Sequence, residues 1–105
     1  MSDHVRGNRY EEIRQWGRDR RIIGNSNSKA QFLKTVEEVG ELATALAKGK
    51  TVDTIDAIGD IIVTLTLVAA CDYLDIEDCI EAAWRAIKDR KGYLNKHGVF
   101  VKEGE

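Results

Sequence analysis

The chain has 105 residues, which is enough for one domain with a modest hydrophobic core. Its 16 Lys and Arg residues are outnumbered by 18 Asp and Glu residues, which gives a net charge of −2. This balance argues against a protein that coats duplex nucleic acid, because such proteins carry an excess of basic residues. The first residues, MSDHVRGNRYEE, contain no apolar segment, so we expect no signal or transit peptide. These features predict a cytoplasmic protein without duplex nucleic-acid or membrane partners, folded as a single domain over residues 1–105.

The spacing of apolar residues predicts a first helix over about Arg9–Arg20 and a second that ends near Lys48. Ser28 is followed three positions later by Gln31, a capping pair at which we expect the second helix to begin. Gly49 is a natural stop, because glycine readily takes the left-handed conformation at a helix end. The apolar stripe of the second helix is expected to face the core and consists of Phe32, Val36, Val39, Ala43, Leu46 and Ala47.

A third helix is predicted to start near Thr51 or Asp53 and to continue to about Tyr73. Asp75 is a candidate cap for a fourth helix, which ends before Gly92. The apolar stripe of this last helix is Ile80, Ala83, Trp84 and Ile87. The tail that follows, HGVFVKEGE, is expected to be extended or disordered. Four helices joined by short loops predict an all-α fold, a four-helix bundle-like subunit.

The segment from Ile61 to Ala70 has no charged residue on any face. It is too short to cross a membrane, which takes about 20 apolar residues. A helix that is apolar all round is buried all round. Three neighbouring helices of so small a chain hardly cover it, so we expect a homo-oligomer, a dimer or a tetramer, assembled through helix packing between subunits.

Two acidic clusters stand on the second and third predicted helices. Glu37, Glu38 and Glu41 fall within five positions with no Lys or Arg between them, nearly opposite the apolar stripe, and taken alone they are typical of a solvated helix face. Asp56 and Asp60 lie one turn apart. Asp56 suits the N-terminal end of a helix dipole, whereas Asp60 lies at the mouth of a buried surface. A carboxylate there costs on the order of several kcal/mol unless it is paired, hydrogen-bonded or bound to metal.

A bundle that sets these two helices side by side gathers carboxylates into a cluster that needs cations. The histidines, His4 and His97, lie near the chain ends, and Cys71 and Cys79 are expected to be small buried thiols without a disulfide. Oxygen ligands without His or Cys suit Mg²⁺, or Mn²⁺ in its place, and the Glu-x-x-His pairs of a ferritin-like di-iron site are absent from the sequence. Bound Mg²⁺ commonly holds phosphate oxygens.

Basic residues close the fourth predicted helix. Arg90 and Lys91 come three and four residues after Ile87, and together with Lys88 they are candidate contacts for triphosphate oxygens that metal does not hold. Cations also suit a helix C-terminus for purely structural reasons.

Lys34 lies one turn before Glu38 and serves either a salt bridge or a phosphate. Trp16 and Trp84 either stack on a nucleobase or fill the core.

Several segments together resemble the MazG-like branch of the all-α nucleoside triphosphate pyrophosphatases. KTVEEVGELATAL resembles the EExxE helix of that family, DAIGDIIVTLTLVAA its second acidic helix, and AAWRAIKDRKGYLNKHGVFVKE the tail of small bacterial and phage members. With QWGRDRRII, the likeness covers nearly the whole chain. It implies Mg²⁺-dependent hydrolysis of a (deoxy)nucleoside triphosphate between the α and β phosphates, by dimers or tetramers of four-helix units. The products are the monophosphate and pyrophosphate.

The same resemblance implies roles for single residues. Glu38, Glu41 and Asp60 are metal ligands, and Glu37 is a further ligand or orients or deprotonates the attacking water. Lys88 and Arg90 contact phosphates.

The chain departs from the family pattern at two positions. The second motif is usually ExxD, but the residue three before Asp60 is Ala57. Asp56 is the nearby acid, and it can replace the missing ligand because residues at i and i+4 share a helix face. Arg85 stands where relatives often carry Asn.

Two alternatives remain open. A phosphoribosyl-ATP pyrophosphohydrolase would share the fold and the metal ligands. A non-catalytic helical oligomer, a scaffold or a regulator that binds nucleotides without cleaving them, is compatible with the acid missing at Ala57.

Overall fold

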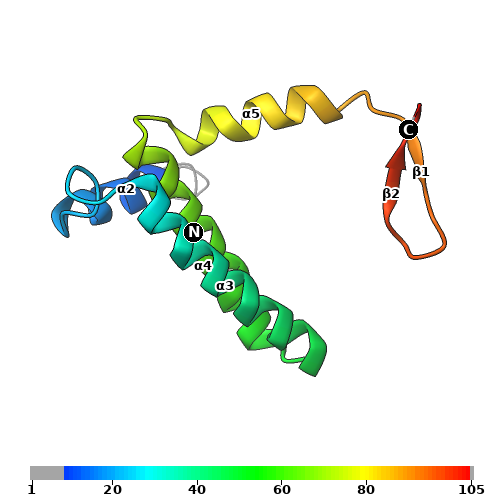
Figure 1. The fold of residues 1–105 in the computed structure, drawn as a ribbon, viewed down its shortest axis with the longest axis horizontal. Coiled ribbons are helices and arrows are strands. Elements are labelled where there is room, and N and C mark those ends of the chain that lie inside the picture. Colours follow the sequence, from blue (N-terminus) through cyan, green and yellow to red (C-terminus); the bar gives the residue numbers. More distant parts are fainter. Residues whose placement is uncertain (1–8, 105) are drawn as a thin grey trace.

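The computed structural model describes residues 9–104 as an open array of helices followed by a β-hairpin (Figure 1). The predicted all-α class is confirmed in this part of the chain. The elements, in chain order, are α2 (Arg9–Asp19), α3 (Ser28–Lys48), α4 (Thr51–Cys71), α5 (Ile76–Ile87), β1 (Gly92–Leu94) and β2 (Phe100–Lys102).

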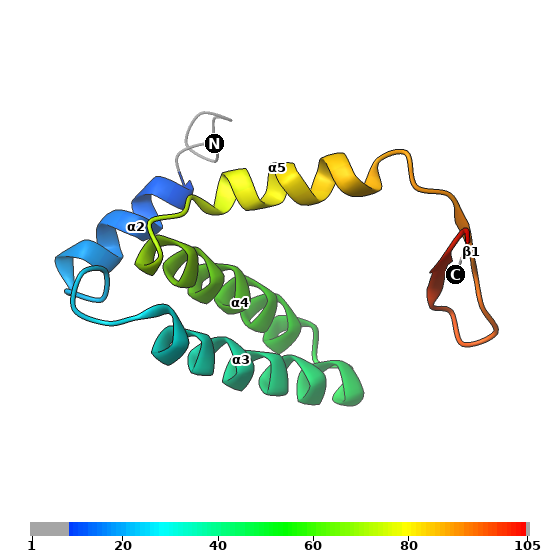
Figure 2. The same ribbon diagram turned by 45° about the horizontal axis from the view of Figure 1, so that its top comes forward.

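Helices α3 and α4 form an antiparallel pair joined by a very short turn (Figure 2). Gly49 has a φ of 66°, in the left-handed region, and its N–H donates to the carbonyl of Leu46 at 3.2 Å. The N–H of Lys50 donates to the carbonyl of Ala45 at 3.0 Å. These two bonds satisfy carbonyls that the helix end leaves open. The predicted stop at Gly49 is confirmed.

The predicted cap of α3 is wrong by one residue. Asn27, not Ser28, is the N-cap, and its Oδ1 accepts from the N–H of Ala30 at 2.8 Å. Gln31 donates to the hydroxyl of Ser26 at 3.0 Å instead of completing a capping box. Asparagine competes as well as serine for this position, and Asn27 already has the extended backbone that a cap requires.

Small residues, not the predicted apolar stripe, form the contact between α3 and α4. Ala45 and Ala57 are each 4% exposed, and the Thr35 hydroxyl donates to the Thr64 hydroxyl at 2.9 Å. Small side chains let the two helix backbones approach closely. The expectation that the stripe of α3 faces the core of this chain is wrong, because Val39 is 50% exposed and Leu46 is 61% exposed.

Helix α2 packs on the C-terminal half of α4. Gly17 is buried, and a Cβ atom built on it would lie 2.6 Å from Cδ2 of Leu67, which is itself 3% exposed. The absence of a side chain at Gly17 thus sets how closely α2 approaches α4. Cys71 at the end of α4 is half-buried, with its Sγ 3.9 Å from the carbonyl of Ile22.

Helix α5 and the hairpin extend away from the other helices (Figures 1 and 2). All residues from Glu77 to Lys91 are exposed, so the core role considered for Trp84 is wrong within one chain. Cys79, expected to be buried, is exposed for the same reason, and both cysteines are free. The predicted extension of this helix beyond Ile87 is also wrong.

The tail is an antiparallel hairpin in which Gly92 pairs with Lys102 and Leu94 with Phe100. At its turn, Oδ1 of Asn95 accepts from the N–H groups of His97 and Val99 at 2.9 and 3.0 Å. Of the two states expected for the tail, the extended one is confirmed at Phe100–Lys102.

By length and composition alone, α4 is the described helix that could cross a membrane, and core helices of soluble proteins meet the same criterion. It carries three aspartates, and it packs against both α2 and α3. An aspartate at the centre of a bilayer costs about 2.5–3.5 kcal/mol. These features favour a core helix, and the absence of a membrane partner stays a prediction.

Candidate functional site

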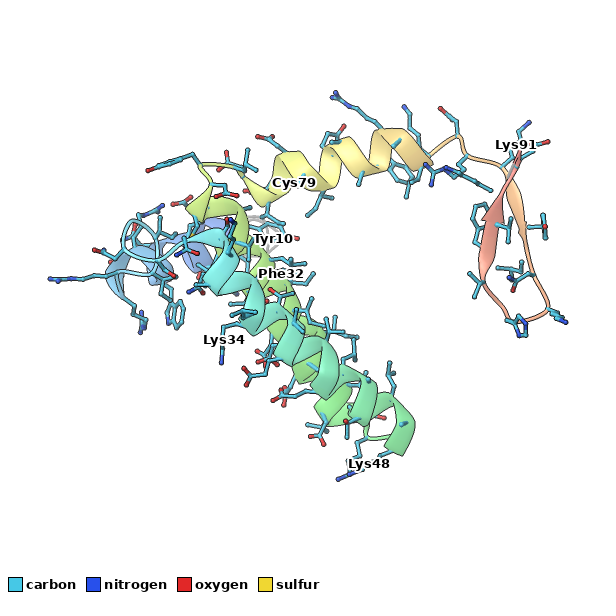
Figure 3. All side chains as sticks on the ribbon, in the orientation of Figure 1. Tyr10, Phe32, Lys34, Lys48, Cys79 and Lys91 are labelled. Atoms are coloured by element: carbon cyan, nitrogen blue, oxygen red, sulfur yellow. The ribbon has the colours of Figure 1, made fainter. Side chains whose placement is uncertain are left out.

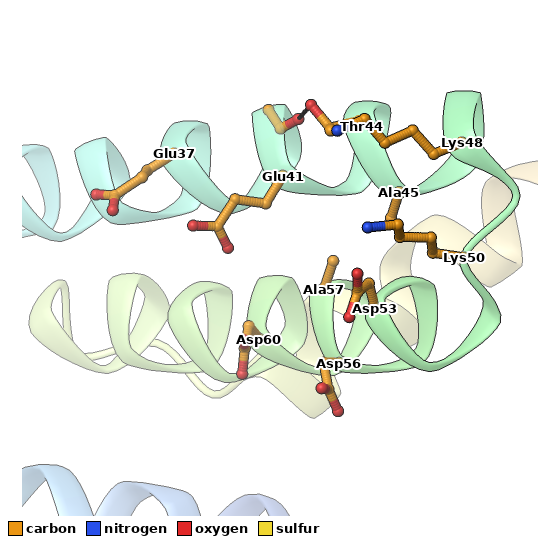
Figure 4. Close-up of a pocket in the computed structure, with 11 residues that line it drawn as sticks. Glu37, Glu41, Thr44, Ala45, Lys48, Lys50, Asp53, Asp56, Ala57 and Asp60 are labelled. Atoms are coloured by element: carbon orange, nitrogen blue, oxygen red, sulfur yellow. Dashed lines mark hydrogen bonds between the residues drawn. The ribbon is translucent and has the colours of Figure 1, made fainter.

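A cleft of about 640 Å³ runs along α3 and α4 near the turn that joins them (Figure 4). Helix α3 contributes Glu37, Gly40, Glu41, Thr44, Ala45 and Lys48. Lys50 and helix α4 contribute the opposite side, with Asp53, Asp56, Ala57 and Asp60. Acids of both predicted clusters therefore face one cleft, Glu37 and Glu41 from α3 and Asp56 and Asp60 from α4, whereas Glu38 is not one of its lining residues.

The helical repeat explains why the acids converge. Glu37 and Glu41 are four residues apart, so they lie on one side of α3. Asp56 and Asp60 have the same spacing on α4, with Asp53 one turn earlier. The antiparallel pairing of the helices then puts these two sides along the same cleft (Figure 4).

Glu38 is the acid that the protein itself leaves unsatisfied. Its Oε2 atom is buried and has no hydrogen-bond partner among the described residues. The pKa of Glu38 is raised, first by its close approach to the Glu41 carboxyl, then by burial, and then by the charges of Glu41, Asp60 and Glu37. Proximity of like charges is a cause of raised carboxyl pKa values, so this group favours either a proton or a cation.

The donors fit a hard divalent cation, although residues 9–104 contain no preformed metal centre. Within residues 9–104, no three His, Cys, Asp or Glu side chains are close enough together to hold a metal ion. The acids nearest to Glu38 are Glu41, Asp60 and Glu37, and all their donors are carboxylate oxygens, as Mg²⁺ prefers. The buried, unpartnered oxygen of Glu38 is the position where a cation would relieve the greatest electrostatic cost.

Two lysines of the cleft were not singled out by the sequence patterns. Lys48 and Lys50 line its end on either side of Gly49. Their signal in the sequence is their place in the turn between the two acidic helices. Lys34 lies at the other end, where its Nζ forms an ion pair with Oε2 of Glu37 at 3.2 Å. Of the two roles considered for Lys34, the salt bridge is therefore present.

Trp16 lies on α2 and lines a second, smaller hollow with Val63 of α4. Val63 is three residues after Asp60, one helical turn along the same helix. The indole is 43% exposed and carries the Arg20 guanidinium over its ring, 4.4 Å from the centroid. Trp16 thus does not fill the core, and its ring is available to a planar group.

The predicted phosphate contacts Lys88, Arg90 and Lys91 lie far from the cleft in this chain. They follow the end of α5 and are exposed. Figure 3 shows Lys91 at the opposite end of the molecule from Lys34 and Lys48. A single chain therefore brings the acids together but does not bring these basic residues to them.

Comparison with known proteins identifies the family. Residues 27–94 match the MazG nucleotide pyrophosphohydrolase domain. The chain belongs to the MazG family. A similar protein is the uncharacterized 18.2 kDa protein of the rep–hol intergenic region of Haemophilus phage HP1 (strain HP1c1), which is 37% identical over 65 residues. That match covers 62% of this chain but 40% of the phage protein. No solved structure matches the chain.

The MazG match confirms the resemblance read from the sequence, and it includes α3, α4 and α5 but not α2. The second acidic motif departs from the family pattern at Ala57, which lies between α3 and α4. Ala57 is 4% exposed where α4 meets α3, and it lines the cleft. Asp56 and Asp53 line the same cleft, so two aspartates accompany Asp60 in place of one acid at position 57.

Proposed function

We propose that this MazG protein hydrolyses a (deoxy)nucleoside triphosphate between its α and β phosphates, releasing the monophosphate and pyrophosphate, in a Mg²⁺-dependent reaction. The observation that carries the proposal is the buried, unpartnered carboxylate oxygen of Glu38 among acids from two helices. Membership of the MazG nucleotide pyrophosphohydrolase domain family supports the reaction class.

In this proposal Glu38, Glu41, Asp60 and Asp56 hold Mg²⁺, or Mn²⁺ in its place. A divalent cation bound there neutralises phosphate charge and makes a coordinated water more acidic. Glu37 is an additional ligand or accepts a hydrogen bond from the attacking water, orienting it or taking its proton. Glu37 lines the cleft and forms an ion pair with Lys34 at 3.2 Å.

Basic residues at the cleft have a separate task. Lys48 and Lys50 line the end of the cleft, where they can neutralise phosphate oxygens without contributing to the carboxylate set. Trp16 lines a hollow with Val63, which lies one turn of α4 after Asp60, and its exposed ring offers a face to a nucleobase. These residues position and neutralise the substrate, and phosphoryl chemistry at a metal centre needs no protein nucleophile.

A binding function without catalysis is the second candidate. The specific observation in its favour is Ala57, together with the lack of a preformed three-acid centre among residues 9–104. In that case the cleft would bind a nucleotide with its cation and release it unchanged. Phosphoribosyl-ATP is the remaining substrate candidate and is added to the assay below.

The direct test is a product assay. The purified protein is incubated with Mg²⁺ and a panel of NTPs, dNTPs and phosphoribosyl-ATP, and monophosphate, pyrophosphate and free phosphate are resolved. We expect monophosphate and pyrophosphate in equal amounts, with turnover lost in Glu38→Gln and in Asp60→Asn. Glu81→Gln is the matched control, because Glu81 is an exposed glutamate on α5, ion-paired with Arg85 at 2.9 Å, and should leave turnover unchanged. Binding without turnover of any candidate would establish the second function instead.

A further inference from the structure

The cleft between α3 and α4 differs in charge along its length (Figure 4). Lys48 and Lys50 line it at the turn, whereas Glu37 and Asp60 line it farther from the turn. At a rise of about 1.5 Å per residue, Asp60 lies about 15 Å along α4 from its N-cap residue Lys50. The cleft therefore has room for a row of phosphate groups, each of which meets different side chains.

The fold uses the backbone of the turn but not the two lysine side chains. The N–H of Lys50 donates to the carbonyl of Ala45 at 3.0 Å, and its carbonyl accepts from the hydroxyl of Thr54 at 2.8 Å. Among residues 9–104, the amines of Lys48 and Lys50 form no ion pair or hydrogen bond, although Asp53 lines the same cleft. The backbone thus fixes the two positions and leaves both ammonium groups to a ligand.

The turn puts one lysine on each side of the cleft. Lys48 is the last residue of α3, Lys50 is the N-cap of α4, and Gly49 joins them with a φ of 66°. Figure 4 shows both side chains extending from the turn back along the cleft, in the direction of Glu41. The two ammonium groups can therefore approach the same ligand from opposite sides.

Basic side chains farther from the turn are already engaged. Nζ of Lys34 forms an ion pair with Glu37 at 3.2 Å. Arg9 lines the hollow beside the indole of α2, and its Nη1 forms an ion pair with Glu12 at 2.9 Å. Unpaired positive charge in the cleft is thus found at the turn, where Lys48 and Lys50 stand.

The hollow beside Trp16 suits the uncharged end of a nucleotide. Val63, which lines this hollow with Trp16, lies one turn of α4 after Asp60, in the direction away from the α3–α4 turn. The Arg20 guanidinium lies 4.4 Å from the centroid of the indole ring and is engaged there. Along α4 the order is therefore unpaired lysine, acids and then an aromatic ring, which matches a triphosphate lying in one direction only.

We propose that Lys48 and Lys50 hold the β and γ phosphates, so that the substrate lies along α4 with its α phosphate near Asp60 and its base towards Trp16. This inference rests on the proposed function and adds the direction of the substrate and the contacts of the leaving group. The site then selects nucleotides that carry two phosphates beyond the α phosphate over diphosphates and monophosphates.

The same placement assigns the two lysines a part in the reaction. The oxygen of water forms a bond to the α phosphorus, and the bond from this phosphorus to the oxygen that bridges the α and β phosphates breaks. That oxygen keeps the electron pair and leaves with pyrophosphate, and the proton of the water passes to Glu37. Lys48 and Lys50 neutralise the charge that pyrophosphate gains, which stabilises the leaving group.

The first test measures binding and needs no turnover. Calorimetry with Mg²⁺ present compares inorganic pyrophosphate with AMP as ligands. In Lys48→Gln with Lys50→Gln, the affinity for pyrophosphate should fall by about tenfold or more, because charged hydrogen bonds are lost. The affinity for AMP should change by less than about twofold, since AMP lacks the distal phosphates.

Two further variants separate position from charge. Lys29→Gln with Lys96→Gln changes the net charge equally at exposed positions outside the cleft and should leave the affinity for pyrophosphate unchanged. Lys48→Arg with Lys50→Arg keeps both charges and should retain most of the affinity. Unchanged pyrophosphate affinity in the double Gln variant at the turn would overturn the proposal. So would an equal loss for pyrophosphate and AMP, because the lysines would then not act at the distal phosphates.

Turnover distinguishes this inference from the proposed function. For the best substrate, the double Gln variant at the turn should lower kcat/KM for the triphosphate by about tenfold or more and for the matching diphosphate by much less. Pyrophosphate binding that depends on the two lysines, without turnover of any nucleotide, would refute the proposed reaction and leave the phosphate site standing. Undiminished turnover in that variant would refute the role of the lysines and leave the reaction standing.

Discussion

Glu38 is the carboxylate whose charge the neighbouring acids and its partial burial destabilise. Because folding raises its pKa, its charge opposes folding. This cost is absent below the ordinary glutamate pKa of about 4.3 and grows as the pH rises through the raised value. Without divalent cations, Glu38→Gln should therefore raise the Tm near neutral pH, and the gain should disappear at about pH 4.

Mg²⁺ should reduce the difference in Tm between Glu38→Gln and the wild type. It should raise the Tm of the wild type more than that of Glu38→Gln, because the variant has lost one of the four proposed Mg²⁺ ligands. Glu81→Gln removes an exposed, paired glutamate outside the cleft and should respond to Mg²⁺ as the wild type does. A Glu38→Gln variant that is less stable than the wild type without metal would contradict the crowding of the acids.

Substitutions at Ala57 test whether an acid at this position would contribute to Mg²⁺ binding. Ala57→Glu restores the ExxD spacing of related sequences but puts a larger side chain at a nearly buried position. We expect it to lower stability without metal by about 1–3 kcal/mol, the usual cost of overpacking, and to strengthen Mg²⁺ binding measured by calorimetry. Ala57→Gln has almost the same volume and no charge, so it should share the cost and not the tighter binding. Equal Mg²⁺ affinity in both variants would show that position 57 does not reach the cation.

At the scale of the elements, the close approach of α2 to α4 depends on Gly17. A methyl group there would meet the buried end of Leu67, so Gly17→Ala should destabilise the fold by about 1–3 kcal/mol in denaturant unfolding. Gly59 provides the matched control, since it lies inside α4 and a methyl group added to it would meet no neighbouring side chain within 4 Å. Gly59→Ala should stabilise by up to about 1 kcal/mol, as alanine does in an open helix position. Similar effects at both glycines would mean that α2 does not pack as described.

The sequence predicted the elements better than their packing. Apolar periodicity located all four helices to within a residue or two at most ends, and Gly49 marked the stop of α3 because its conformation is a local property. The stripe of α3 was correctly recognised as apolar, but periodicity does not say what covers such a stripe. The contact with α4 uses Thr35 and Ala45 instead, residues whose small size matters more than their hydrophobicity.

For the candidate site too, local features could be predicted from the sequence and non-local packing could not. Glu37, Glu41, Asp56 and Asp60 could be placed along one cleft because i and i+4 spacing and a short turn determine their meeting. The direction of α5 could not be predicted, since it depends on Arg14 and Glu77, which are 63 residues apart in the sequence. The distance between the cleft and Lys91 follows from the direction that α5 takes.

For the whole molecule, the ion pair between Arg14 and Glu77 makes the free energy of unfolding depend on pH in the acid range. Arg14 lowers the pKa of Glu77 to about 2, so the ion pair stabilises the fold above the ordinary glutamate pKa, and this contribution is lost as the pH falls towards 2. Glu77 is partly exposed, and with solvent screening the effect should be no more than about 1 kcal/mol. Glu77→Gln should thus be less stable than the wild type at neutral pH and show a shallower loss in acid unfolding. Parallel pH profiles would contradict the pair.

The open shape is the property of the whole molecule that matters most for function. The radius of gyration is 16.3 Å, against about 13 Å for a compact domain of this length. The helices α3 and α4 present the acids, whereas Lys88, Arg90 and Lys91 follow the end of α5, and Figure 3 shows Lys91 far from Lys34 and Lys48 on α3.

The central claim, attack of water on the α phosphorus of a nucleotide bound at the acidic cleft, is tested most directly by the position of an isotope. The protein is given its best substrate and Mg²⁺ in H₂¹⁸O, and the products are weighed by mass spectrometry. Our account predicts one ¹⁸O atom in the monophosphate and none in pyrophosphate, with no labelled product from Asp60→Asn. Label in pyrophosphate or in free phosphate, or turnover that survives Asp60→Asn, would contradict it.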